Sequence, residues 1–140
     1  MVKYLLEEEF EFDFKLLGIS SHVKDYRLCW TVNKSLGLDL IKLDEEIIIR
    51  LKNGVEPISF SVYYYLDDES EVEFELICNR HEDGYLIPEL KKADYFLKVS
   101  EYHEFGVDEL INLLRKANLI NMAFEIDVNS LRSKQNLLHL

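Results

Sequence analysis

The spacing of hydrophobic positions predicts a strand followed by an amphipathic helix early in the chain. Residues 14–19 are mostly apolar and predict a first strand. Residues 23–36 carry apolar side chains at helical spacing, Ser20 and Ser21 offer an N-cap, and Gly37 stands where a left-handed residue ends many helices. The helix has a predicted apolar arc of Val23, Tyr26, Leu28, Cys29, Trp30, Val32 and Leu36, opposite Lys24, Arg27, Thr31, Lys34 and Ser35. We expect the apolar arc to pack against the rest of the protein.

Strict alternation of apolar and polar residues from 58 to 78 predicts a β-hairpin. Its first strand, residues 58–66, alternates apolar side chains with Ser and Tyr, and its second strand, residues 71–78, alternates apolar side chains with Glu. Residues opposed across a hairpin share a face of the sheet. The predicted register pairs Leu66 with Val72 and Tyr64 with Phe74 on the core side, and Tyr65 with Glu73 and Tyr63 with Glu75 on the outer side.

The outer side of this hairpin supplies four candidate contact residues: Tyr63, Tyr65, Glu73 and Glu75. Tyrosines beside carboxylates make ordinary cross-strand pairs, yet aromatic residues on a solvent-facing sheet are also typical of protein interfaces. Carboxylates in a row on one strand face repel one another unless water or a basic partner surrounds them. Both interpretations, ordinary pairing and a partner surface, stay open at this point.

The remaining elements complete an α+β pattern. Short strands are predicted at 38–43 and 46–51, a strand at 93–99, a helix that opens at Gly106, and a strand at 122–128. The order β-α-β, then β-hairpins, then β-α-β predicts an α+β fold. We expect a two-layer sandwich in which two helices cover one face of a mostly antiparallel sheet. Such folds host enzymes, sensors and binding platforms, so the architecture does not decide the function.

Length and charge refine this picture. A chain of 140 residues predicts a single α+β domain over 1–140, with an acidic arm at 1–12 and a tail at 132–140 as the segments least tied to it. The formal net charge of −11 disfavours nucleic acid as a partner, because proteins that bind nucleic acid present basic surfaces. Most of this charge is local: residues 1–13 hold five acids and one base, and residues 67–75 hold six acids and no base.

Targeting signals and chemical motifs are missing from the sequence. It shows neither a secretory signal nor an apolar run of the ~20 residues that a membrane helix needs, so we expect a cytoplasmic protein with no membrane partner. Cys29 and Cys78 are then free thiols rather than a bridge. Cys78 and His81 have the spacing of a metal-ligand pair, but one pair supplies at most two of the four ligands of a structural zinc site. The sequence therefore suggests no catalytic residue, no metal and no cofactor.

The segment Ile87-Pro88-Glu89-Leu90-Lys91-Lys92-Ala93-Asp94-Tyr95 resembles the signature of the IPExxxVDY family, small bacterial proteins of the Bacteroidota, with Ala93 in place of Val. Residues 25–28 with Asn33 and Lys34, and residues 127–134, are also similar to that family. The change from Val to Ala keeps the position apolar. The resemblance implies a bacterial protein and does not imply a particular activity.

The signature has two interpretations. In the functional one, Pro88, Glu89, Asp94 and Tyr95 form a polar site that grips a ligand or partner. In the structural one, Pro88 ends a strand, Asp94 caps a turn and Tyr95 is the first core residue of its strand. We favour the structural interpretation, because a cap needs one backbone donor whereas a site needs several convergent groups.

Asn33 is a polar residue beside Tyr26 in the predicted apolar arc, so its buried amide needs partners. A hydrogen bond to a carbonyl and a ligand contact both satisfy it. The leading hypothesis for function is a non-enzymatic protein-interaction or regulatory domain. This hypothesis includes self-association of the domain. The alternative is a small-molecule sensor or minor enzyme with a pocket between helix and sheet near Tyr26, Asn33 and residues 89–95.

Overall fold

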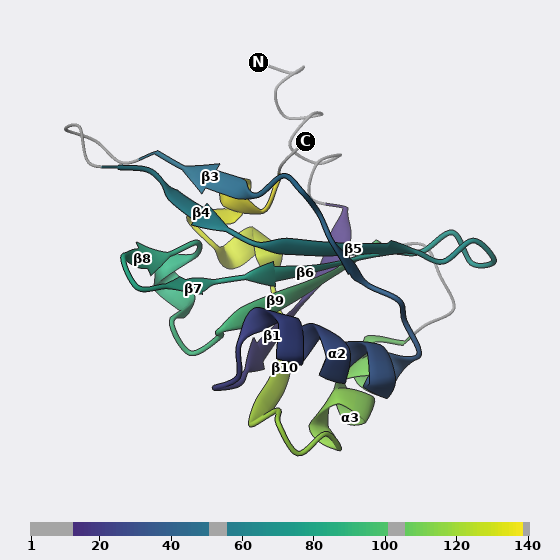
Figure 1. Ribbon diagram of the computed structural model, residues 1–140. Coiled ribbons are helices and arrows are strands. Elements are labelled where there is room, and N and C mark those ends of the chain that lie inside the picture. The colour runs from purple at the N-terminus through teal and green to yellow at the C-terminus, as the bar shows by residue number, and fades with distance from the viewer. Residues whose placement is uncertain (1–12, 51–55, 101–105, 139–140) are drawn as a thin grey trace.

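A six-stranded antiparallel sheet is the centre of the computed structural model, which describes residues 13–50, 56–100 and 106–138 (Figure 1). The strand order across the sheet is β10-β1-β9-β6-β5-β2. Its strands are β1 (Phe14–Ser20), β2 (Ile41–Lys42), β5 (Val62–Leu66), β6 (Glu73–Cys78), β9 (Tyr95–Ser100) and β10 (Met122–Ile126). Two separate hairpins pair β3 (Ile47–Ile49) with β4 (Ile58–Phe60), and β7 (Arg80–His81) with β8 (Gly84–Tyr85). The predicted acidic arm at 1–12 lies outside the described residues.

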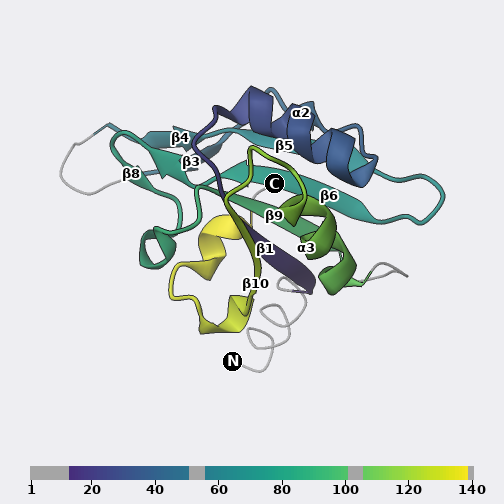
Figure 2. The same ribbon diagram turned by 90° about the horizontal axis from the view of Figure 1, so that it is seen from below.

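Two helices, α2 (Asp25–Leu36) and α3 (Val107–Arg115), pack on one face of the sheet, which confirms the predicted α+β fold. The views in Figures 1 and 2 show the helices as neighbours. One hydrophobic cluster joins them to the sheet, and its central members are Leu28, Val32, Leu110, Leu114, Leu17, Ile19, Leu76 and Leu97. In the described part of the chain, no helix is long and apolar enough to cross a membrane.

The opposite face of the sheet is also buried, which differs from the two-layer arrangement we expected. A second hydrophobic cluster on that face includes Leu16, Phe60, Val62, Ile77, Phe96 and Ile126. It is covered by the β3–β4 hairpin and by short 3-10 turns at Pro88–Leu90, Val128–Ser130 and Lys134–Leu137. The physical reason is visible in β1 and β9, where apolar residues stand next to one another, because a strand buried on both faces does not alternate.

The tail at 132–140 is packed over its described part. Leu131 and Leu137 are buried in the second cluster, and the side-chain amide of Asn136 donates to the carbonyl oxygen of Leu86 at 2.8 Å. Residues 132–138 therefore belong to the layer that covers this face of the sheet.

Helix α2 forms close to its predicted bounds, and the face that it presents to the core is narrower than the predicted arc. Gly37 ends it with φ 69°, as predicted. Lys24 is the N-cap and makes no side-chain capping bond, so the prediction of a Ser20 or Ser21 cap is wrong. Tyr26 and Trp30, 66% and 60% exposed, point away from the core, whereas Thr31 is buried. Both aromatic residues stand two positions from the buried Leu28, and at about 100° per residue two positions lead to the opposite side of a helix.

The β5–β6 hairpin has a register one residue away from the predicted one. The structure pairs Leu66 with Glu73, Tyr65 with Phe74, Tyr64 with Glu75 and Tyr63 with Leu76. The connection between Leu66 and its partner is one residue longer than expected, because the N–H of Asp67 donates to the carbonyl oxygen of Val72 and Glu71 adopts a left-handed φ of 62°. Tyr63 and Tyr65 therefore face the helices, and Tyr64 joins Glu73 and Glu75 on the other face.

The predicted strands at 38–43 and 46–51 are shortened to β2 and β3, and they enter different sheets. β2 pairs with β5, and β3 pairs with β4. The turn at Asp44 and Glu45 thus connects the edge of the main sheet to the covering hairpin rather than two neighbouring strands.

Candidate functional site

The signature residues Asp94 and Tyr95 connect β9 to the segment between β1 and α2. The Asp94 carboxylate is nearly buried, accepts a hydrogen bond from the backbone N–H of Ser21 at 2.9 Å, and pairs with Arg80 at 3.3 Å. The hydroxyl of Tyr95 donates to the carbonyl oxygen of Val23 at 2.6 Å. Tyr95 is buried at the start of β9, as the structural interpretation predicted, whereas Asp94 bonds to the distant backbone of Ser21 rather than capping its own turn.

Glu89 connects a different pair of segments. Pro88 opens the short 3-10 turn, and the Glu89 carboxylate that follows accepts the backbone N–H of Ser133 at 2.6 Å and its hydroxyl at 2.9 Å. Partial burial alone would raise the pKa of Glu89, but the hydrogen bonds donated by Ser133 and its neighbours outweigh it and the pKa is lowered. Glu89 therefore fixes the C-terminal layer, and its partners differ from those of Asp94.

Asn79 makes the most hydrogen bonds in this region, and its role was not predicted from the sequence. Its side chain is fully buried and makes three hydrogen bonds: to the carbonyl oxygens of Leu90 (3.1 Å) and Ala93 (2.7 Å), and from the N–H of Ile87 (2.7 Å). These bonds fix the backbone conformation of the signature segment, residues 87–95. The signal in the sequence was a lone Asn directly after the apolar run of β6, a position that is also typical of an exposed turn.

Asn33 confirms the hydrogen-bond interpretation. Its amide nitrogen donates to the carbonyl oxygen of Leu40 at 3.3 Å and its amide oxygen accepts the N–H of Leu40 at 2.8 Å, which ties the end of α2 to the residue just before β2. The same amide lies 3.7 Å from the sulfur of Cys29. Burial raises the pKa of the Cys29 thiol to about 11, which is the behaviour of a buried structural thiol.

The predicted contact residues of the hairpin do not form one surface. Tyr63 is buried under the helices. Glu73 accepts the hydroxyl of Tyr64 at 2.6 Å, and Glu75 pairs with Lys98 at 3.4 Å. The predicted pocket is not assembled either, because Tyr26 is exposed on the outer side of α2, Asn33 bonds to the chain just after that helix, and the signature residues bond elsewhere.

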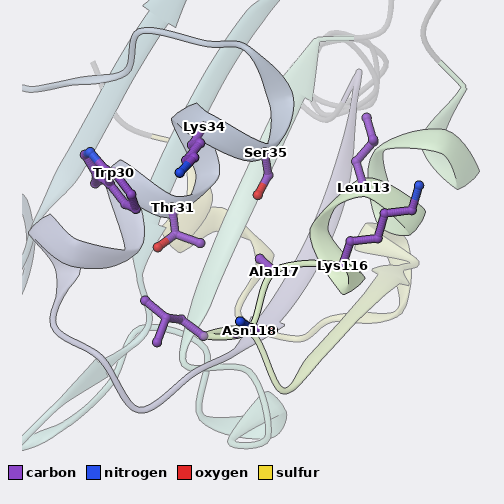
Figure 3. Close-up of a pocket in the computed structure, with 9 residues that line it drawn as sticks. Trp30, Thr31, Lys34, Ser35, Leu113, Lys116, Ala117 and Asn118 are labelled. Atoms are coloured by element: carbon purple, nitrogen blue, oxygen red, sulfur yellow. The ribbon is translucent and has the colours of Figure 1, made fainter.

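A groove between α2 and α3 is the cavity best suited to a ligand or partner (Figure 3). Its volume is about 440 Å³. The α2 wall carries Trp30, Thr31, Lys34 and Ser35, and the other wall carries Leu113, Lys116, Ala117, Asn118 and Leu119. Figure 3 shows Trp30 and Lys34 close together on α2, and Ala117 and Asn118 in the chain after α3 across from Thr31 and Ser35.

The electrostatics of the groove favour an anionic group attached to an apolar body. The Lys34 ammonium lies 4.9 Å from the centre of the Trp30 ring, a cation–π geometry that holds the charge beside the aromatic surface. Within the described part of the chain, neither Lys34 nor Lys116 has a carboxylate within ion-pair distance. Apolar Leu113, Ala117 and Leu119 line the rest of the groove. The arrangement can bind an apolar group and neutralise a carboxylate at the same time.

Comparison with protein-family models, with curated proteins and with solved structures finds no match. The resemblance to the IPExxxVDY family stays a prediction from the residues that carry it. In the described ranges, no group of three or more His, Cys, Asp or Glu side chains is placed to hold a metal ion. The structure thus defines an α+β protein with a basic, aromatic groove between its two helices. This groove is the candidate functional site.

Proposed function

We propose that this protein is a cytoplasmic interaction domain. It binds, in the groove between α2 and α3, a segment of a partner protein that carries both acidic and apolar side chains. One observation carries the proposal: the outer stripe of α2, formed by Tyr26, Trp30 and Lys34, is exposed, and Trp30 and Lys34 line the groove. The three residues stand at i, i+4 and i+8, so they form one line on the helix surface. The cytoplasmic setting rests on the sequence alone.

The exposed aromatic residues on this stripe support a protein partner. Tyr26 and Trp30 are 66% and 60% exposed, although aromatic side chains usually gain stability by burial. Tyr and Trp are enriched at protein interfaces and dominate their binding free energy. An exposed pair beside a groove therefore favours an interface over a surface without a partner.

The local charge supports an acidic partner. The outer side of α2 carries Lys24, Arg27 and Lys34 on a chain whose net charge is −11. A basic patch on an acidic protein attracts carboxylates at short range. The same overall charge repels the continuous phosphate backbone of nucleic acid, so carboxylates of a protein segment suit the patch better.

The volume of the groove supports a second candidate function, the binding of a small molecule. About 440 Å³ lies in the range of small-molecule sites, so an amphiphilic organic anion also fits the groove. A metabolite that binds only the folded state raises the unfolding temperature by mass action. A screen of organic acids by thermal shift tests this function, and stabilisation that disappears in Trp30→Ala would favour it over a protein partner.

Trp30 makes the proposal directly measurable, because it is the one tryptophan in the 140-residue sequence. Proteins captured from the host by tagged wild type would be titrated onto the purified chain while the fluorescence of Trp30 is recorded. We expect a blue shift of the emission, since binding in the groove removes the indole from water. The shift should be lost in a variant carrying Lys34→Gln and Lys116→Gln.

The control places the same change on another exposed lysine pair, Lys91→Gln with Lys92→Gln at the signature loop. This variant should bind like wild type, and all proteins should unfold at similar temperatures. Partners that bind wild type and the Lys34 and Lys116 variant equally well, with no change in Trp30 emission, would overturn the proposal.

A further inference from the structure

We infer that the groove accepts the acidic β5–β6 turn of a second copy of this chain, so that copies associate head to tail. The inference rests on the proposed function of the groove and names its partner. Groove and turn are different patches of one molecule, and their chemistry is complementary.

The turn combines carboxylates with an apolar residue. Asp67, Asp68, Glu69 and Glu71 crowd the turn, and the segment 67–75 contains no Lys or Arg. Among the residues that the structure describes, Asp68, Glu69 and Glu71 have no ion-pair partner. Leu66, at the start of the turn, is 43% exposed. The turn therefore presents a large exposed apolar side chain beside unpaired carboxylates, which is the combination of groups that the groove is suited to bind.

The turn is held in shape before any contact forms. The N–H of Asp67 donates to the carbonyl oxygen of Val72 at 2.9 Å, and the N–H of Glu71 donates to that of Asp67 at 2.7 Å. The hydroxyl of Ser70 donates to the Asp67 carboxylate at 2.6 Å. A preformed turn loses little conformational freedom on binding, which favours association through a small surface.

The placement of the turn favours contact between copies. Both ribbon views show it projecting beyond the body of the molecule, past the end of α2 (Figures 1 and 2). The residues that line the groove come from α2, from α3 and from the chain after α3, so the turn of the same chain does not fill it. In a second copy, Leu66 can pack on Trp30 while the carboxylates meet Lys34 and Lys116.

A contact between two different patches leaves one free turn and one free groove at the ends of every assembly, so chains or rings form rather than a closed pair. One turn in one groove buries less surface than a standard interface, which makes the contact weak. Because its charges stay near solvent, it should also weaken as salt is added.

The first test measures mass and Trp30 emission as a function of protein concentration. At about 20 mM salt, where the Debye length is roughly 20 Å, we expect the weight-average mass from sedimentation to rise above one protomer by about 300 μM. The Trp30 emission should shift to the blue over the same range. At about 0.5 M salt the apparent association constant should fall at least tenfold.

The second test uses two variants that each lose one side of the contact. A turn variant carries Asp68→Asn and Glu69→Gln, and a groove variant carries Lys34→Gln and Lys116→Gln. Each alone should associate at least tenfold more weakly than wild type. Their equimolar mixture should form a 1:1 pair that grows no further, because it contains one intact groove and one intact turn. A matched control, Glu82→Gln with Asp83→Asn at the β7–β8 turn, should associate like wild type.

The outcomes separate this inference from the proposed function. A protomer mass at every concentration in low salt, equal effects of the turn variant and its control, or a mixture that grows beyond a pair would overturn the inference. If the protein remains a protomer but another acidic partner still shifts Trp30 emission in a manner dependent on Lys34 and Lys116, the inference fails and the groove keeps its function. If the protein remains a protomer and no acidic partner shifts the Trp30 emission, both the inference and the proposed function fail.

Discussion

Buried polar side chains hold the connections of this protein, and each does so by hydrogen bonding to the backbone. Asn79 is the strongest case, because its amide satisfies three main-chain groups in a loop that has no regular ladder of its own. A satisfied buried hydrogen bond contributes only about 1 kcal/mol, but removing one partner leaves the other without water or a substitute. Positions of this kind therefore matter more to stability than their polarity suggests.

Replacing Asn79 by Ala should lower the free energy of unfolding by about 3 kcal/mol, since three buried backbone groups lose their partner. Urea unfolding followed by circular dichroism measures this change. Asn112 on the exposed side of α3 is a suitable control, and Asn112→Ala should change stability by no more than about 0.5 kcal/mol. Equal effects at the two positions would contradict the role assigned to Asn79.

Glu89 predicts a pH dependence with a definite sign. The pKa of Glu89 is lowered in the folded state from its ordinary value of 4.5, so the charged form stabilises the fold. This contribution is complete above about pH 4.5 and is lost as the pH falls through the lower folded-state pKa. We expect Glu89→Gln to be less stable than wild type at neutral pH and the difference to shrink as the pH falls through the lowered pKa of Glu89.

Urea unfolding of wild type and Glu89→Gln between neutral and acidic pH measures this difference. Glu125→Gln, at an exposed position of β10, is the matched control and should show a small difference at every pH. A gap between wild type and Glu89→Gln that stays constant over the whole acidic range in which the protein remains folded would rule out the carboxylate as its source.

At the scale of an element, the register of the β5–β6 hairpin predicts unequal roles for neighbouring tyrosines. Tyr63 lies under the helices at 6% exposure, whereas Tyr64 is half-buried on the other face. Tyr63→Ala should therefore cost about 4 kcal/mol and Tyr64→Ala about 1 kcal/mol in unfolding free energy. The alternative register, with Tyr64 in the core, requires the opposite order, and thermal or urea unfolding of the two variants distinguishes the two.

Local patterns predicted the elements better than their pairing. β1, α2 and the left-handed Gly37 follow from periodicity and from the special conformation of glycine. The hairpin register does not, because it depends on Glu71 taking a left-handed φ that a residue other than glycine seldom adopts. One residue in a turn thus moved Tyr63 and Tyr65 from the predicted outer face to the inner one.

The candidate site was predictable only in part. The need of the Asn33 amide for partners could be anticipated, but Leu40 as the partner depends on how the chain leaves α2. The groove could not be anticipated, because its walls come from helices that lie far apart in the sequence. The i, i+4 spacing of Tyr26 and Trp30 indicates only that the two aromatic side chains share one side of α2.

For the whole molecule, the second buried face makes the C-terminal layer a part of the core. Leu137 has no exposed surface, and its carbonyl oxygen accepts a hydrogen bond from the Lys98 ammonium at 2.9 Å. We expect Leu137→Ala to destabilise the protein by about 3 kcal/mol, within the range for buried leucines. Leu138→Ala, at the half-buried neighbouring position, should cost clearly less in the same urea titration. Similar small losses at both positions would show that the layer is dispensable.

The position of β1 in the sheet has a consequence for how the chain is made. β1 pairs with β9 on one side and with β10 on the other, although both strands come much later in the sequence. During synthesis at about 5–20 residues per second, Leu16 and Leu17 leave the ribosome several seconds before Tyr95 and Met122 can offer them a sheet. An apolar strand whose partner strands have not yet been synthesised is a binding site for chaperones and a starting point for aggregation. The yield of folded protein should therefore depend on how fast the chain is translated.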